Sequence, residues 1–141
     1  MAPALLDHVL VACPRCAERA LVHERDGRTR LTCGRCGLAR GAPTGHRIAW
    51  SAIGEDGREE LFGTRLWLTT ECCGGRLLWA LNEGHLDVLE RFVSSTDRDR
   101  DFPSPPGNRG LASKLPKWIG LAANRAELLR AIATLRRRLD G

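Results

Sequence analysis

The chain has 141 residues, of which 43% are hydrophobic and 28% charged, and its formal net charge is +5. A chain of this size forms one ordinary domain, or a small metal-stabilised unit followed by a modest second one. No apolar run is long enough for a membrane span, and the first residues lack the basic and apolar regions of a secretory signal, so we expect a soluble cytoplasmic protein.

A short apolar run at 8–12, which we predict to be a strand, leads into the first of two Cys-x-x-Cys pairs, Cys13 with Cys16. The second pair is Cys33 with Cys36, after an interval of sixteen residues. Pairs at this spacing are typical of a structural zinc site with four thiolate ligands. A redox motif would normally be a single pair at a helix start, and disulfides would need a secreted chain. We predict one structural Zn²⁺ bound by these cysteines, with iron–sulfur or redox use as the remaining alternatives.

The segment between the two pairs predicts a β-hairpin. Strand-like stretches at 20–23 and 29–32 flank Asp26-Gly27, which is a strong signal for a two-residue hairpin turn. The second strand then brings Cys33 to the metal. This order of knuckle, hairpin and knuckle resembles a zinc ribbon, the set of short antiparallel strands found in transcription factors of the IIB type, in RNA polymerase subunits and in replication and ribosomal proteins.

The middle of the chain predicts a second hairpin. Residues 47–50 have the pattern of a strand, 53–60 that of a loop, and 61–70 that of another strand, which returns at 76–80 after a turn at 71–75. We expect this hairpin to stack on the ribbon sheet or to extend it. Much of its core is expected to come from three tryptophans, Trp50, Trp67 and Trp79.

Cys72 and Cys73 lie in the predicted turn beside two glycines. Successive strand residues face opposite sides of a sheet, so adjacent cysteines seldom share a metal, and a disulfide between them is strained. We interpret them as small residues of a tight turn, at least one of them buried. A second metal site with His85 or His46, and a thiol enzyme, are the weaker alternatives. For His85 itself we favour a packing or surface role over catalysis.

From residue 82 the apolar residues recur at helical spacing. Asn82 is expected to cap a helix with an apolar face formed by Leu86, Leu89, Phe92 and Val93. Residues 111–121 predict a short helix or helical turn broken by Pro116. Asn124 and Glu127 are expected to cap a terminal helix. One face of that helix carries Leu128, Ile132, Leu135 and Leu139.

These elements predict an α+β fold, with an N-terminal zinc ribbon of antiparallel strands extended by a second β-hairpin and followed by C-terminal α-helices. We expect a ribbon at 1–50, a hairpin and helix packed on it at 51–96, a linker at 97–110 and a helical segment at 111–141.

Motifs in the second half of the chain resemble a group of small bacterial zinc-ribbon proteins. They are 77–82, His85-Leu86, Leu89-Glu90, 115–119 and Asn124-Arg125. The resemblance covers nearly the whole chain and implies the ribbon fold. It implies no particular activity, because that group is labelled by its ribbon, with transcription or replication-restart names borrowed from other ribbon proteins.

The arginines of the predicted ribbon are candidate nucleic-acid contacts. Arg15 and Arg35 lie inside the knuckles, with Arg28, Arg30 and Arg40 nearby. Guanidinium groups on a rigid, metal-bound loop can contact phosphates or guanine edges with little further loss of freedom. The alternative is that they are ordinary solvated residues in an arginine-rich chain.

Charge is concentrated at both ends of the chain. Residues 8–50 hold eight arginines and three acids, and 111–141 hold seven Lys or Arg and two acids, whereas 51–110 hold eleven acids and seven arginines. For residues 136–138, all arginine, we favour stabilisation of a helix C-terminus. The alternative is a phosphate-contacting tail acting with Lys114 and Lys117.

The sequence has no nucleophile motif, phosphate-binding loop or metal-protease motif, so we predict no enzymatic activity and no small-molecule substrate. We predict instead a zinc-ribbon protein that binds DNA or RNA in transcription, replication or RNA metabolism. The alternative is a zinc-stabilised interaction subunit or adaptor of a larger protein complex, whose contact surface would be the apolar face of the terminal helix. Burial of that face within the monomer discriminates between the two.

Overall fold

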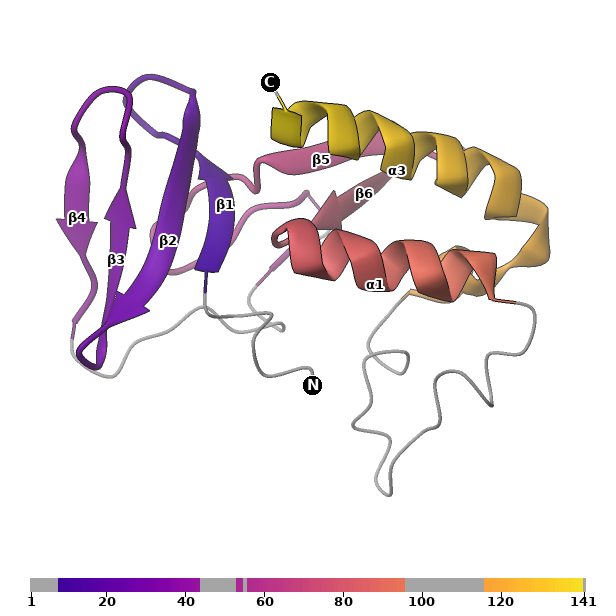
Figure 1. Ribbon diagram of the computed structural model, residues 1–141, viewed down its shortest axis with the longest axis horizontal. Helices are drawn as coiled ribbons and strands as arrows, with labels where there is room; N and C mark the ends of the chain where they lie inside the picture. The colour runs from indigo at the N-terminus through magenta and orange to yellow at the C-terminus, as the bar shows by residue number, and fades with distance from the viewer. Residues whose placement is uncertain (1–7, 44–52, 55, 96–115, 141) are drawn as a thin grey trace.

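The computed structural model describes residues 8–43, 53–54, 56–95 and 116–140. Over these residues the protein is a mixed α+β structure with antiparallel strands and two C-terminal helices. Figure 1 shows a sheet at one end and, beside it, a hairpin that lies behind the helices. The predicted strand at 47–50 and the predicted linker at 97–110 lie outside the described residues.

A four-stranded antiparallel sheet forms the N-terminal part of the protein. Its strands lie in chain order and are β1 (His8–Ala12), β2 (Arg19–Arg25), β3 (Arg28–Thr32) and β4 (Ala39–Gly41). Asp26 and Gly27 join β2 to β3 with φ angles of 53° and 75°, the positive values that a two-residue hairpin turn needs. The strand at 8–12 and the first hairpin are confirmed, and β4 is an edge strand that the sequence pattern did not predict.

The second hairpin is a separate two-stranded sheet of β5 (Leu68–Cys72) and β6 (Arg76–Ala80). The return strand is confirmed, but β5 begins at Leu68 instead of residue 61. The residues before it form a loop closed by isolated bridges, one of which pairs Arg58 with Arg65. Backbone pairing thus competes with the strand propensity of this stretch, and the strand begins only where β6 is available as a partner.

The two sheets are joined along the outer edge of β1. The backbone N–H of Leu10 donates to the carbonyl of Leu81 at 2.8 Å, and the N–H of Trp67 donates to the carbonyl of Leu10 at 2.9 Å. Because side chains alternate along β1, Val9 and Val11 pack in one buried cluster and Leu10 packs in the other. A single strand therefore contributes to both hydrophobic cores.

A buried carboxylate closes the loop between the sheets. Glu59 is fully buried, with an exposed fraction of 0%. Its oxygens accept hydrogen bonds from the backbone N–H groups of Phe62 and Thr64 at 2.9–3.1 Å and from Oγ1 of Thr64 at 2.5 Å. Phe62 in turn packs against the core that contains Val9 and Val11. The Glu59 carboxylate thus supports the loop over that core, together with the isolated backbone bridges.

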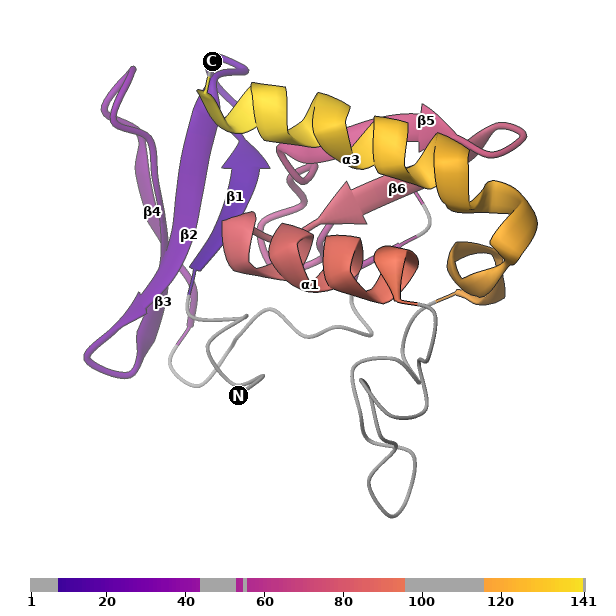
Figure 2. The same ribbon diagram turned by 45° about the vertical axis from the view of Figure 1, so that its right-hand side comes forward.

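Two helices, α1 (Glu83–Ser94) and α3 (Arg125–Asp140), cover one face of the β5–β6 hairpin (Figure 2). As predicted, Asn82 caps α1, since its Oδ1 accepts from the N–H of His85 at 2.9 Å. The expected apolar face of α1 is buried, and so are Leu128, Ile132 and Leu135 of α3, with Leu139 half-buried. Among the described residues no helix combines the length and apolar character needed to cross a membrane.

Leucines, rather than tryptophans, fill most of the core. Trp67 and Trp79 are half-buried and pack at the margins of the two clusters, because an indole is too large to be enclosed easily in so small a domain. Trp50 lies outside the described residues. The largest fully buried apolar side chains are Leu31, Leu66, Leu68, Leu78, Leu81, Leu86, Leu89, Leu128, Leu135 and Ile132.

The residues expected to cap α3 contact neighbouring segments instead. Two short 3-10 turns, η4 (Lys117–Gly120) and η5 (Ala122–Asn124), precede the helix. The Nδ2 of Asn124 donates to the carbonyl of Trp118 at 2.9 Å, and the Glu127 carboxylate accepts from the N–H of Cys73. These side chains therefore attach α3 to η4 and to the β5–β6 turn, which are tertiary contacts that a local capping pattern cannot reveal.

The arginines near the end of α3 dock the helix on the rest of the protein. Arg136 donates to both Asp87 and Glu90 of α1 at 2.7 Å. Arg138 stacks over the ring of Trp67 at 4.3 Å and donates to its carbonyl at 2.8 Å. These arginines therefore do more than favour the negative end of the helix dipole, and they are engaged within the protein.

Candidate metal centre

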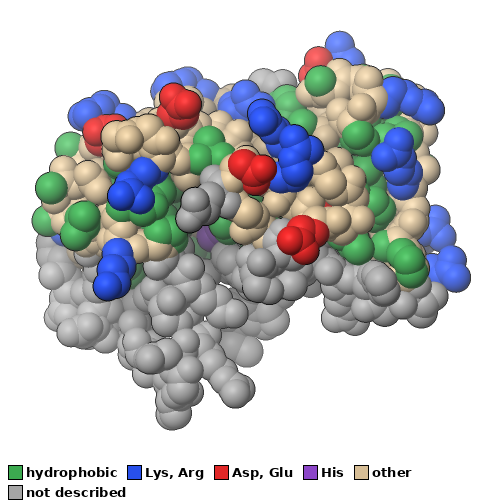
Figure 3. All heavy atoms as spheres, turned by 180° about the vertical axis from the view of Figure 1, so that it is seen from behind, with side chains coloured by type: hydrophobic (Ala, Val, Ile, Leu, Met, Phe, Trp, Pro, Cys, Tyr) green, Lys and Arg blue, Asp and Glu red, His purple; other side chains and the backbone are tan. Residues whose placement is uncertain are grey.

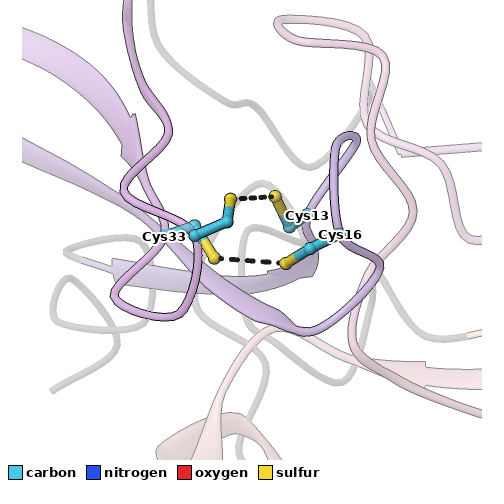
Figure 4. A group of neighbouring side chains, drawn as sticks. Cys13, Cys16 and Cys33 are labelled. Atoms are coloured by element: carbon cyan, nitrogen blue, oxygen red, sulfur yellow. Dashed lines mark hydrogen bonds between the residues drawn. The ribbon is translucent and has the colours of Figure 1, made fainter.

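The predicted metal ligands come together at one end of the β1–β4 sheet, where their sulfurs point toward one another (Figure 4). The Sγ atoms of Cys13 and Cys36 are 3.6 Å apart, as are those of Cys16 and Cys33, and all four lie within 4.8 Å of one another. A tetrahedral ion with metal–sulfur bonds of ~2.3 Å gives sulfur–sulfur edges of ~3.8 Å, whereas disulfide sulfurs are ~2.05 Å apart. The tetrad therefore fits a single tetrahedral metal ion.

The two knuckles have the same backbone hydrogen bonds. The N–H of Cys13 donates to the carbonyl of Glu18 at 2.8 Å, and its own carbonyl accepts from Ala17 at 2.9 Å. Likewise the N–H of Cys33 donates to the carbonyl of Leu38, and the carbonyl of Cys33 accepts from the N–H of Gly37, both at 2.9 Å. The residue after each knuckle has a positive φ, 65° at Ala17 and 81° at Gly37. This left-handed residue turns the chain back toward the sheet, at no steric cost for glycine.

The four thiols do not all ionise readily without a cation. Burial raises the pKa of Cys13, but hydrogen bonds from the backbone of Cys16 and Arg15 outweigh it and lower that pKa to about 6. A backbone hydrogen bond at Glu18 lowers the pKa of Cys16, but burial and the neighbouring thiols, Cys33 first, raise it to about 12. A divalent cation among the sulfurs removes this repulsion and allows four thiolates to coexist.

The predicted nucleic-acid-binding arginines are divided between the two ends of the sheet. Arg15 and Arg35 are exposed in the knuckles, beside the metal ligands. Arg28 is the first residue of β3 and lies beside the hairpin turn. It is five residues, and therefore ~16 Å, from Cys33, which follows the strand. Arg28 and Arg30 line a shallow pocket of about 230 Å³ together with Arg40 of β4. Arg40 pairs with Leu31 in the sheet register, so it lies on the opposite face from Arg28 and Arg30.

Cys72 and Cys73 form a disulfide between adjacent residues, contrary to expectation. The turn makes this pairing possible, because Cys73 and both glycines that follow it have positive φ angles. Cys72 ends β5 and is buried, as predicted for at least one of the pair. One carboxylate oxygen of Glu127 lies within 4.8 Å of both sulfurs. His85 is not part of that cluster, and His46 lies outside the described residues.

His85 has a packing role at the junction between β6 and α1. Its side chain is 1% exposed, and its Nδ1 accepts from the backbone N–H of Leu81 at 3.0 Å, which requires a neutral ring with Nδ1 unprotonated. The ring also makes an edge-to-face contact with Trp79 at 5.9 Å. Burial lowers the pKa of His85 from 6.5 to about 4. This environment agrees with the packing interpretation of this residue.

The buried imidazole predicts a loss of stability on acidification. Because the pKa of His85 is lower in the folded protein, the unfolded chain binds more protons between pH 6.5 and about 4. His85 therefore contributes its full stability above pH 6.5, and stability falls as the pH approaches 4. Between pH 7 and pH 5 we expect wild type to lose about 2 kcal/mol more than His85→Gln, measured by urea unfolding. Parallel pH profiles for the two proteins would contradict this assignment.

Known proteins give no further information on this centre. A scan against protein-family models and searches of curated proteins and of solved structures find no match to this chain. The resemblance to small bacterial zinc-ribbon proteins therefore stays a prediction, and the chain is assigned to no family by these comparisons.

Proposed function

We propose that the cysteine tetrad binds one structural Zn²⁺ and that the β1–β4 sheet with its two knuckles is a zinc ribbon. The support is the convergence of four sulfurs at the spacing of a tetrahedral site, with backbone N–H groups directed at the thiolates. Four protein ligands complete the coordination of zinc, so the ion stabilises the fold and has no free position for a substrate. Elemental analysis of the purified protein should give one zinc per chain. Bound iron, or no metal, would contradict the proposal.

We further propose that the protein is not an enzyme and that it binds nucleic acid through the outer surface of β3 and β4. Arg28 and Arg30 lie on the same face of β3 beside one shallow pocket, and this pair is the observation that carries the proposal. Two guanidinium groups at alternate positions of one strand suit neighbouring phosphates. Residues 8–43 contain three acids and seven arginines, all of them exposed. Those arginines are Arg15, Arg19, Arg25, Arg28, Arg30, Arg35 and Arg40.

The exposure of the apolar face of the terminal helix discriminates between nucleic-acid binding and the alternative of an interaction subunit. In the structure Leu128, Ile132 and Leu135 of that face are buried against α1 and the hairpin. The described part of α3 therefore has no row of exposed leucines for a partner helix. This burial favours the nucleic-acid proposal over the alternative.

The test is nucleic-acid affinity across a salt series, with the zinc content checked in every variant. The logarithm of the binding constant falls linearly as the logarithm of the salt concentration rises. Removing one phosphate-binding arginine should make this slope shallower by about 0.9 on duplex DNA. The double variant Arg28→Gln with Arg30→Gln should therefore make the slope shallower by about 2, and it should weaken binding at low salt. The matched control is Arg130→Gln with Arg137→Gln, which removes two exposed arginines from α3. No binding by wild type at low salt, or equal effects of both double substitutions, would contradict the proposal.

A further inference from the structure

A groove with two indole rings lies along β6, on the side of the hairpin turn. It has a volume of about 600 Å³, within the range of ligand sites, and it is bounded by β6 and by η4. Trp79 lines it from β6 and Trp118 from η4. The turn between β5 and β6 points away from the β1–β4 sheet (Figure 2), so the groove and the arginine pocket are separate sites.

The charged lining of this groove has one sign. Arg76 and Lys117 both line it, and both side chains are exposed. The guanidinium of Arg76 lies 5.8 Å from the centre of the Trp118 ring, so a cation stands beside an aromatic face. Among the described residues no carboxylate lines the groove. Figure 3, which views the protein from behind, shows Lys and Arg side chains near hydrophobic ones over much of that face.

The aromatic wall is held by contacts within the protein. The carbonyl of Trp118 accepts from Nδ2 of Asn124 at 2.9 Å, and Ile119, the next residue, is 5% exposed in the core. Trp118 itself is half-buried, with its ring against the same core. Leu121, at the groove margin, is 53% exposed, the one large hydrophobic side chain so exposed among the described residues. The structure thus presents a fixed ring and an apolar edge to solvent.

We propose that this groove binds an unpaired nucleotide of single-stranded DNA or RNA. The base stacks on Trp118 in place of the Arg76 guanidinium, with Trp79 and Leu121 forming the apolar walls. Arg76 and Lys117 contact the phosphates on either side of it. An indole face can stack on any base, and the positive charges of Arg76 and Lys117 favour an anionic ligand. A nucleotide has both a base and a phosphate, whereas an apolar peptide would contact the indole rings but supply no negative charge. This site lies beyond the proposed arginine surface and does not depend on it.

The first test is a titration of isotope-labelled, zinc-loaded protein with a 5′-phosphorylated dithymidylate, observed through the indole N–H signals. A dinucleotide is too short to span both sites, so it reports on the groove alone. The Trp118 and Trp79 signals should shift, and the Trp67 signal, under Arg138, should stay in place. Arg28→Gln with Arg30→Gln should leave these shifts unchanged even if the arginine surface proves inactive. Absence of shifts at the highest soluble dinucleotide concentration would overturn the proposal.

The second test uses variants of the ring and of the cation with an octathymidylate. Trp118→Leu should weaken binding about five- to 150-fold, the range expected for removal of one base stack, and Trp118→Phe should restore most of it. Lys117→Gln should make the slope of log K against log salt shallower by about 0.7, the value expected for one phosphate contact on a single strand. Retained zinc and unchanged core signals show that each variant is folded. If an acidic, leucine-containing peptide shifts the two indole signals more than the dinucleotide does, the groove binds a protein and the proposal is wrong.

Discussion

Chelation of the metal that we propose for the cysteine tetrad is expected to unfold the β1–β4 sheet at neutral pH. Both knuckles are closed by their cysteines, and thiols at this spacing repel one another once they ionise. In zinc-finger peptides the metal contributes about 10–16 kcal/mol, which is comparable to the entire stability of a domain. Since β1 is bonded to the hairpin, we also expect α1 and α3 to lose part of their protection. Amide hydrogen exchange before and after chelation measures both effects.

Substitutions separate the metal from other roles of cysteine. Cys33→Ser should behave like the chelated protein, because its Sγ is one corner of the tetrad. Cys72→Ser with Cys73→Ser is the control, since that pair lies in the β5–β6 turn and should leave metal content and sheet protection unchanged. If the sheet of the chelated protein keeps its exchange protection, the metal is not what stabilises it.

Removing the buried carboxylate of the 53–66 loop is expected to cost about 3 kcal/mol of unfolding free energy. Glu59→Ala leaves the N–H groups of Phe62 and Thr64 without their acceptor and opens a space beside the core. Each unsatisfied buried donor costs about 1–3 kcal/mol, and part of this is recovered as the loop relaxes toward water. Urea unfolding of the zinc-loaded protein measures the difference.

The neighbouring residue supplies a matched control for this effect. Glu60→Ala removes the same charge from an exposed position and should change stability by less than about 0.5 kcal/mol. Glu59→Gln, which keeps one acceptor oxygen, should fall between the two alanine variants. Equal effects of Glu59→Ala and Glu60→Ala would show that the hydrogen bonds of the carboxylate contribute nothing net.

The sequence predicted the features that depend on local chemistry. The spacing of the cysteines predicted that their four sulfurs converge, because a two-residue gap directs both sulfurs of a pair to one side. Asp26-Gly27 indicated the hairpin, and Asn82 indicated the start of α1, since each acts through its own backbone neighbours. Helical spacing likewise identified the buried face of α3.

Features that depend on distant partners were not predictable in this way. Glu59 looked like one more acid of a polar loop, and only the folded loop supplies its donors. Arg136 and Arg138 fitted a helix C-terminus, yet their partners lie on α1 and before β5. The groove between β6 and η4 is formed by segments about forty residues apart, so no sequence window contains both of its tryptophans.

The position of the metal ligands also bears on the order in which this protein folds during its synthesis. All four cysteines lie within the first 36 residues, and a two-residue turn brings the pairs together. A hairpin closes in about 1–10 μs, whereas the residues from 37 to Glu83, where α1 begins, take roughly 2–9 s to synthesise at 5–20 residues per second. The proposed ion can therefore be bound on the ribosome before either helix has been made. We therefore expect metal supply at that moment, rather than helix packing, to set how soon the N-terminal sheet becomes resistant to proteases.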